Sequence, residues 1–247
     1  MIIVRHSEIY TKSKPVRRRF IDRLTHNIRI ALPKAKVIPK KWRIYVEGAD
    51  KDSKKLEKVF GVASFSVAQE CAADFNAIKK LAGKVKVKSP FAVRTKRLAK
   101  EFPMTSQEIN EKIGAFVQKR TKAKVNLEKP KTTIHIEIYG KKAHVFGEVF
   151  DGPGGLPTGT AGEVTVLLKN KDSVKAALMM MKRGVKMNAL GDKKLVKELQ
   201  KWSCGHNIKL VDDIQGPGVV TGTRSAAEFA KLEKKYDMPV YAPLIGL

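Results

Sequence analysis

Basic side chains form the clearest chemical pattern in the sequence. The segment Phe91-Ala-Val-Arg-Thr-Lys-Arg97 places Arg94, Lys96 and Arg97 within four positions. Such cations neutralise neighbouring phosphates of a polyanion. The pattern therefore predicts phosphate contacts for these three residues.

A second group of cations opens a helix that we expect over residues 16–32. Its apolar residues recur every four positions, and Pro15 suits a first helical turn. Arginines fill that first turn, where the helix dipole disfavours positive charge. Either a phosphate contact or a solvated face explains this placement, and we predict phosphate contacts for Arg17 and Arg18. Lys119 and Arg120, at the end of a later expected helix, complete the set of predicted contacts.

Nucleophilic or metal chemistry has little support in the sequence. Cys71 and Cys204 are too few for a disulfide scaffold or a four-cysteine zinc site. Cys204 lies two residues before His206. We favour a structural role for this thiol, and a catalytic pair with His206 is the alternative. His135 and His144 would approach each other in a hairpin, but two histidines without a carboxylate make a poor zinc site. We therefore predict no catalytic residue and no metal site.

The net charge of +26 on 247 residues predicts a polyanionic partner. Residues 1–150 hold 35 basic and 14 acidic side chains, a net charge of +21, whereas residues 151–247 hold 15 and 10, a net charge of +5. The sequence has no apolar run of membrane-spanning length, and its N-terminus lacks the apolar segment of a secretory signal. We therefore expect a cytoplasmic protein without membrane contact.

Helices and strands alternate along the basic part of the chain. We expect strands at residues 2–5, 42–46, 61–67, 91–97, 134–139 and 143–150, and helices at 16–32, 53–60, 72–81 and from 105 onward. Thr105 and Glu108 have the spacing of a capping box. The alternating Lys84, Lys86 and Lys88 would share one face if they lay on a strand. This order predicts two α+β units with antiparallel sheets.

A run of glycines and prolines from Asp151 to Gly159 predicts a domain boundary, because it cannot continue a helix or a central strand. Beyond it we expect strands at 163–168, 184–190, 207–211 and 218–221, separated by helices at 172–183, 193–202 and 223–235. Such an alternating order predicts an α/β domain with a parallel sheet and right-handed crossovers.

Several motifs resemble, in the same order, one family of RNA-modifying enzymes. Residues 91–97, 102–109 and 114–117 resemble the THUMP domain, and Ser7-Glu8-Ile9 with the following helix resembles the ferredoxin-like domain that precedes THUMP in tRNA 4-thiouridine synthetases. Residues 154–162, 177–184, 220–222 and 243–246 are similar to the same family.

This resemblance implies four parts of the chain: an N-terminal ferredoxin-like domain at 1–68, a THUMP RNA-binding domain at 69–150, a linker at 151–162, and a truncated PP-loop ATP-pyrophosphatase-like (Rossmann-like) domain at 163–247. It also implies that the partner is tRNA, held at its acceptor 3′ end. The resemblance thus makes RNA the ligand of the basic residues predicted above: Arg17, Arg18, Arg94, Lys96, Arg97, Lys119 and Arg120.

The C-terminal part departs from the family where ATP would bind. The family has a Ser-Gly-Gly-x-Asp-Ser-Pro loop after the first strand, and this chain has Leu-Lys-Asn-Lys-Asp-Ser-Val at 168–174. Asp172 and Ser173 match, but the glycines that let a backbone approach phosphates are absent. Residues 184–220 are also shorter than the family's stretch and omit its sulfur-handling cysteine. The nucleotide-binding candidates are therefore Asp172, Ser173 and Gly222, under the assumption that ATP binding persists.

Three functions are compatible with these patterns. We favour a tRNA-binding THUMP protein with a degenerate PP-loop, no adenylation activity and no cofactor. The alternative is an active ATP-dependent tRNA sulfurtransferase that makes 4-thiouridine, uses ATP and Mg²⁺, and receives sulfur from the cysteine of a partner protein. The third is a basic protein that coats nucleic acid indiscriminately. A homodimer is compatible with each of them.

Overall fold

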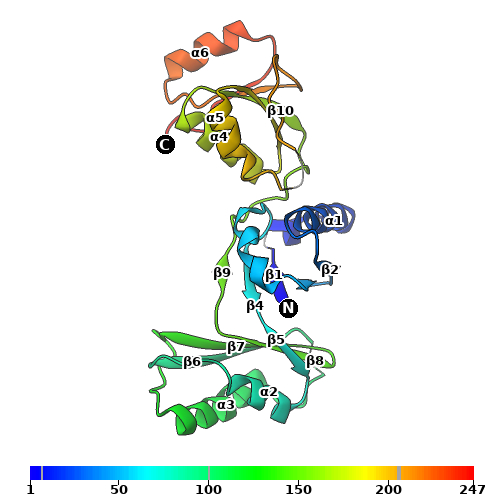
Figure 1. Cartoon of the computed structure of the whole chain (residues 1–247), viewed down its shortest axis with the longest axis vertical. Helices are drawn as coiled ribbons and strands as arrows, with labels where there is room; N and C mark the ends of the chain where they lie inside the picture. Colours follow the sequence, from blue (N-terminus) through cyan, green and yellow to red (C-terminus); the bar gives the residue numbers. More distant parts are fainter. Residues whose placement is uncertain (7, 100, 205–206) are drawn as a thin grey trace. The chain divides into compact units, whose positions relative to one another are not determined.

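A computed structural model describes residues 1–6, 8–99, 101–204 and 207–247 (Figure 1). Ser7 and His206, which the sequence patterns singled out, lie outside the described residues. The chain divides into two compact units, and each is described by itself. One unit contains Met1–Ile3, Tyr45–Asp50 and Ser66–Phe150, and the other contains Val4–Ile44, Lys51–Phe65 and Asp151–Leu247.

The first sheet has the strand order β2-β3-β1-β4-β9. Its strands are β1 (Ile2–Arg5), β2 (Lys36–Pro39), β3 (Ile44–Glu47), β4 (Ser64–Val67) and β9 (Phe150–Asp151). Strand β2 was not expected from the sequence, and the expected helix at 53–60 is the 3-10 helix η2 (Asp50–Lys58). A short 3-10 helix, η1 (Glu8–Thr11), precedes helix α1 (Lys14–Ala31), which buries Phe20, Leu24 and Ile28 as the four-residue spacing predicts.

The second sheet has the strand order β5-β8-β7-β6. Helices α2 (Phe75–Ala82) and α3 (Ser106–Thr121) lie together on one of its faces (Figure 1). The strands are β5 (Gln69–Ala72), β6 (Phe91–Arg97), β7 (Thr132–Tyr139) and β8 (Lys142–Phe146). The expectation of antiparallel sheets is wrong for β6 and β7, which pair in parallel. A parallel pair needs a crossover connection, and α3 supplies it.

Local side chains decide where the helices of this sheet begin. The predicted capping box is confirmed, because the side chain of Thr105 accepts from Glu108 N–H and the Glu108 carboxylate accepts from Thr105 N–H. Helix α2 begins three residues later than expected, because Asp74 caps it and residues 69–72 form β5. Lys84, Lys86 and Lys88 do not lie on a strand, and all three side chains are exposed.

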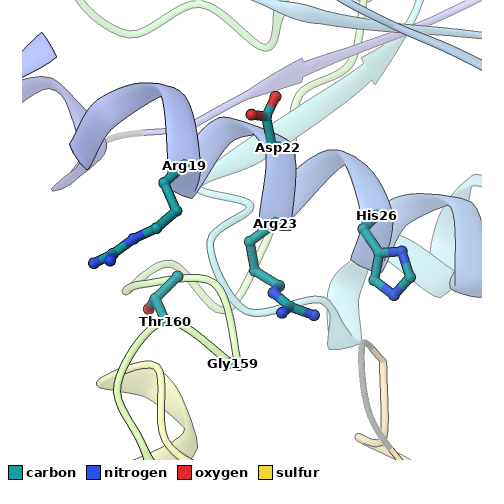
Figure 2. Close-up of a pocket in the computed structure, with 6 residues that line it drawn as sticks. All are labelled: Arg19, Asp22, Arg23, His26, Gly159 and Thr160. Carbon is teal, nitrogen blue, oxygen red and sulfur yellow. The ribbon is translucent and has the colours of Figure 1, made fainter. Parts of the chain in front are cut away.

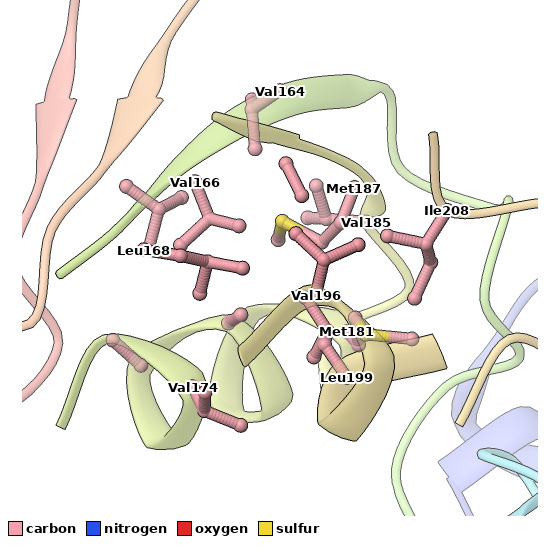
Figure 3. Packing of buried hydrophobic residues seen from close by; sticks show 14 of the residues in the cluster. Val164, Val166, Leu168, Val174, Met181, Val185, Met187, Val196, Leu199 and Ile208 are labelled. Atoms are coloured by element: carbon pink, nitrogen blue, oxygen red, sulfur yellow. The ribbon is translucent and has the colours of Figure 1, made fainter. Parts of the chain in front are cut away.

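The third sheet is parallel throughout, as predicted, with the order β11-β10-β12-β13. Its strands are β10 (Glu163–Leu168), β11 (Lys186–Gly191), β12 (Val219–Val220) and β13 (Val240–Tyr241), and its helices are α4 (Lys171–Lys182), α5 (Lys193–Gln200) and α6 (Ala226–Lys235). Val166, Met181 and Leu199 from the sheet, α4 and α5 meet in its core (Figure 3). The expected strand at 207–211 is reduced to a single bridge between Ala189 and Leu210.

Among the described residues, no helix is long and apolar enough to cross a membrane.

Candidate nucleic-acid interface

The two arginines predicted at the start of α1 have different roles in the structure. Arg17 is half-buried, and its Nη2 donates to the carbonyl oxygens of Tyr10 (3.0 Å) and Lys12 (3.1 Å). It therefore fixes the segment that leads into the helix. Arg18 is exposed and, with Lys14 and Arg19, lines a shallow depression along the first turns of α1. Only Arg18 of this predicted pair has a guanidinium directed to solvent.

A deeper pocket lies between the next turns of α1 and the loop that carries Gly159 and Thr160. Its volume is about 500 Å³. Figure 2 shows Arg19 and Arg23 extending from one side of α1 toward this loop, with His26 following on the same side, whereas the Asp22 carboxylate points away. The pocket is consequently lined by two guanidinium groups, with no carboxylate directed toward the loop.

Backbone hydrogen bonds hold the loop side of this pocket in place. The N–H groups of Gly159, Thr160 and Ala161 all donate to the carbonyl of Gly184, at 2.8, 3.0 and 3.1 Å. Gly159 has φ +94°, and a Cβ there would lie 3.2 Å from Nε of Arg23. Glycine therefore allows both the left-handed backbone and the close approach of the guanidinium.

Helix α1 also binds this loop directly. The buried Asn27 donates through Nδ2 to the carbonyl of Thr158 at 3.1 Å. The sequence predictions missed Arg19, Arg23 and His26 as a group. Their spacing of four and three residues places them on one helix face, which is the signal that identifies them. No pattern in the sequence pairs that face with residues 159–160.

The predicted cations of β6 point to both faces of its sheet. Arg94 and Lys96 are exposed on one face, and Nη2 of Arg94 donates to the carbonyl of Leu127 at 3.1 Å. Arg97 lies on the helix-covered face, where Nη1 donates to the carbonyls of Phe102 (3.2 Å) and Met104 (2.9 Å). Arg97 therefore holds the loop before α3, and Arg94 with Lys96 presents charge to solvent.

Lys119 and Arg120 are exposed on the last turn of α3, where cations suit the helix dipole. The side chain of Arg120 reaches Gly83 at the end of α2, where a Cβ would lie 2.5 Å from Nη1 of Arg120. Glycine at position 83 thus leaves room for this arginine. The two helix ends bring Arg120 close to the basic stretch that begins at Lys84.

The first turn of α4 follows β10 and contains Asp172 and Ser173, the two residues that match the family's loop in sequence. Asn170 caps this helix, and its Oδ1 accepts from Ser173 N–H at 3.0 Å. The hydroxyl of Ser173 in turn accepts from the N–H groups of Lys169 and Asn170, both at 3.1 Å. Three N–H groups that could face a phosphate are therefore bonded to side chains of this chain itself.

The structure brings together the three nucleotide-binding candidates of the sequence. Gly222 packs against the start of α4, where a Cβ would lie 2.2 Å from the backbone nitrogen of Ser173. Arg224 binds Asp172 in a two-pronged ion pair, with Nε–Oδ2 at 3.0 Å and Nη2–Oδ1 at 3.1 Å, and donates to the carbonyl of Leu247. The hydrogen bonds from Arg224 lower the pKa of the Asp172 carboxyl. Close packing explains why position 222 is glycine.

The histidines do not meet as expected. His135 stacks on Phe146, and His144 contacts the carboxylate of Glu70 at 3.3 Å while its ring stacks on Tyr45. In the register of β7 and β8, His144 lies opposite Glu137 and not opposite His135. Burial lowers the pKa of His144, although Glu70 opposes the shift.

Metal and thiol chemistry gain no support from the geometry. The described part of the chain contains no group of three or more histidine, cysteine or acidic residues arranged to hold a metal ion. Cys71 and Cys204 are free thiols, and burial raises the pKa of each.

Two family models match the chain side by side. Residues 1–66 match the ThiI ferredoxin-like domain, and residues 72–147 match the THUMP domain. The chain belongs to the THUMP-domain family of the ThiI type. Members of this family provide the sequence relatives and the fold neighbours described next.

The chain is related to tRNA sulfurtransferases. It is 38% identical to a probable tRNA sulfurtransferase of Methanocaldococcus jannaschii over 202 residues, which cover 74% of this chain and 53% of the relative. The corresponding Thermococcus kodakarensis protein is 36% identical, with 82% and 59% covered. The Saccharolobus islandicus protein is 34% identical, with 95% and 66% covered. This THUMP-domain chain thus spans between half and two thirds of the length of these relatives.

Solved structures share the fold over the whole chain. PH1313 from Pyrococcus horikoshii has a TM-score of 0.87 and 30% identity, with 100% of this chain and 94% of that chain covered. A 4-thiouridine synthetase solved with RNA and ATP has a TM-score of 0.83 and 24% identity, with 100% and 81% covered. The latter likeness establishes the fold of this THUMP-domain chain, and its ligands are properties of that protein.

Proposed function

We propose that this chain binds tRNA through its ferredoxin-like and THUMP domains, with the acceptor 3′ end held by the THUMP part, and that it does not adenylate tRNA by itself. The names of its relatives and the RNA in the solved 4-thiouridine synthetase support tRNA as the ligand class. The exposed cations of α1, β6 and α3 supply the charge that phosphates require. We expect this binding to take place in the cytoplasm, without a membrane partner.

The observation that carries the second half of the proposal is the self-capped first turn of α4. Backbone N–H groups of a phosphate loop have to be free to face the ligand. Here Asn170 and Ser173 accept those hydrogens, and Arg224 neutralises Asp172, which would otherwise be available to a nucleotide's Mg²⁺. ATP would have to break these bonds before it could bind, so we propose no cofactor for this chain.

One observation favours the alternative of an active sulfurtransferase. Asp172, Ser173 and Gly222 do lie together at the end of a parallel strand, where nucleotides bind in such sheets. In that case ATP and Mg²⁺ would displace Arg224, and a partner protein would supply the sulfur-carrying cysteine.

Two measurements on the whole chain separate these functions. The first is the dissociation constant for tRNA and for the same tRNA without its unpaired 3′ nucleotides, determined at several salt concentrations. We expect strongly salt-dependent binding and a clear loss of affinity when the 3′ end is removed. Equal affinity for both RNAs would contradict 3′-end recognition and favour indiscriminate coating of nucleic acid.

The second measurement is ATP–pyrophosphate exchange in the presence of tRNA and Mg²⁺. We expect no exchange above that of a reaction without protein. Exchange that depends on both tRNA and this chain would overturn the non-adenylating proposal and favour the sulfurtransferase alternative.

A further inference from the structure

The hairpin between β2 and β3 carries an exposed indole among cations. The N–H of Lys40 donates to the carbonyl of Arg43 at 2.8 Å, which closes a tight turn with Lys41 and Trp42 at its tip. Trp42 is 37% exposed, and the side chains of Lys40 and Lys41 are also exposed. Part of a large aromatic ring is therefore open to solvent at the tip of a polar turn.

Several contacts fix the position of this tip. The hydroxyl of Tyr10 donates to the carbonyl of Trp42 at 2.9 Å, and Nη1 of Arg43 donates to the same carbonyl at 2.8 Å. The Tyr10 ring lies 5.9 Å from the Trp42 ring and 4.6 Å from the ring of His6, which is 4% exposed. Three rings thus form a row from the interior to the surface, and Trp42 is its outer end.

The charge around the row is positive. Nζ of Lys41 lies 5.1 Å from the centre of the Trp42 ring. Arg17 and Arg43 lie on the inner side, and with burial they lower the pKa of His6 to about 4, so His6 is neutral at pH 7. The cluster therefore combines an aromatic surface, held in place by hydrogen bonds, with exposed lysines. This is the chemistry used to bind single-stranded nucleic acid.

We propose that Trp42 stacks on one unpaired nucleobase of RNA, while Lys40 and Lys41 bind the flanking phosphates. This inference rests on the proposed function for its ligand class and adds a contact site on the ferredoxin-like part. The ring of one indole matches one base in area. It is too small for a stable protein interface, which needs about 800 Å² from each partner. The flexible Lys41 side chain can move from the ring to a phosphate when the base takes its place.

Tryptophan fluorescence reads out this contact directly. The chain contains two tryptophans, and Trp202 is half-buried against Phe60, with ring centres 5.4 Å apart. A Trp202→Phe chain therefore keeps a similar ring there and leaves Trp42 as the sole indole. We expect its emission to be quenched by tRNA and by a single-stranded RNA of about ten nucleotides, a length within the usual site size.

Binding measurements on variants test the energetic side. Stacking on one base predicts that Trp42→Ala weakens RNA binding about 5-fold or more with an unchanged salt slope, and that Trp42→Phe retains most of the affinity. Lys41→Gln should lower the salt slope by about one. Tyr241→Ala is the matched control, because Tyr241 is 39% exposed in another part of the fold. It should bind RNA like the unaltered chain.

Each outcome is informative. Unchanged emission together with wild-type affinity of Trp42→Ala would overturn the stacking site, even if tRNA binding itself is confirmed. Quenching by anionic lipid vesicles but not by RNA would also overturn it, in favour of a membrane surface. If tRNA does not bind but the short RNA still quenches Trp42, the proposed tRNA function is wrong and the stacking site is supported.

Discussion

The pocket between α1 and the 159–160 loop allows a quantitative prediction. Replacing Arg19 and Arg23 together by glutamine removes the two guanidinium groups that point toward the loop and keeps side chains of similar length. If each arginine binds one phosphate, the doubly substituted chain loses two such contacts. The loss should appear as weaker tRNA binding and as a smaller dependence of binding on salt.

The magnitude follows from counterion release. Each phosphate contact contributes about 0.7 to 0.9 to the slope of log K against log salt, so two contacts amount to about 1.5. At a salt concentration of about 0.15 M this slope corresponds to roughly 15-fold in affinity, or about 1.6 kcal/mol. The expected signature is therefore a moderate loss of affinity together with a definite change of slope.

Filter binding or fluorescence anisotropy at several salt concentrations would measure both quantities. The matched control is Lys231→Gln with Lys234→Gln on α6. Both lysines are exposed, and their replacement removes the same net charge, but from the nearly balanced C-terminal part. We expect the control to retain the original slope. If both variants lose the same affinity, long-range charge explains binding, and the assignment of phosphates to this pocket is refuted.

Four further predictions concern stability. In the described structure both ring nitrogens of His6 are buried without a hydrogen-bond partner, and its folded pKa is about 4, so the unfolded chain binds the proton more tightly. About 3 kcal/mol of stability should therefore be lost as the pH falls from 6.5 to 4. Urea unfolding at both pH values should show that His6→Phe removes this loss. Asn170→Ala should lower the unfolding free energy by about 1 kcal/mol, because α4 loses its cap. Gly222→Ala should lower it by about 1–3 kcal/mol, because the added Cβ collides with the α4 backbone. Thermal unfolding measures both effects, and an unchanged stability in either variant would refute the corresponding contact. Arg224 lowers the folded pKa of Asp172, so the ion pair stabilises the fold above the unfolded Asp pKa, and this stability is lost as the pH falls through the folded pKa. In Arg224→Met the loss of stability at acid pH should be smaller. An unchanged dependence of stability on acid pH would contradict this role of the ion pair.

Local signals in the sequence predicted the elements that short-range chemistry determines. Strand β6 has the bounds that were expected, and the box formed by Thr105 and Glu108 starts α3 where predicted. Parallel pairing of β6 with β7 was also within reach, because an intervening helix excludes a tight hairpin. The antiparallel prediction rested on the order of the elements, which by itself does not give the direction of the strands.

Long-range geometry explains what the sequence did not predict. Arg94 and Arg97 are three positions apart on one strand and therefore point to opposite faces, but only the packing of α3 shows which face is covered. The α1 pocket joins Arg23 to Gly159, which is far along the chain. The cap formed by Asn170 was not predicted, because the helix was expected to begin at residue 172 and begins at Lys171.

The same residues explain how the N–H groups at the start of α4 are satisfied within the chain itself. In an ATP-binding loop, unsatisfied N–H groups at a helix start are stabilised by the ligand, and the empty loop is a weak point. Here Asn170 and Ser173 bond those groups internally, and Arg224 provides the positive charge beside Asp172. Gly222 is required by this arrangement, because its backbone lies against Ser173 where no Cβ fits. We therefore infer that the glycine and the Asp-Ser pair are kept for packing, so their agreement with the family motif is weak support for ATP binding.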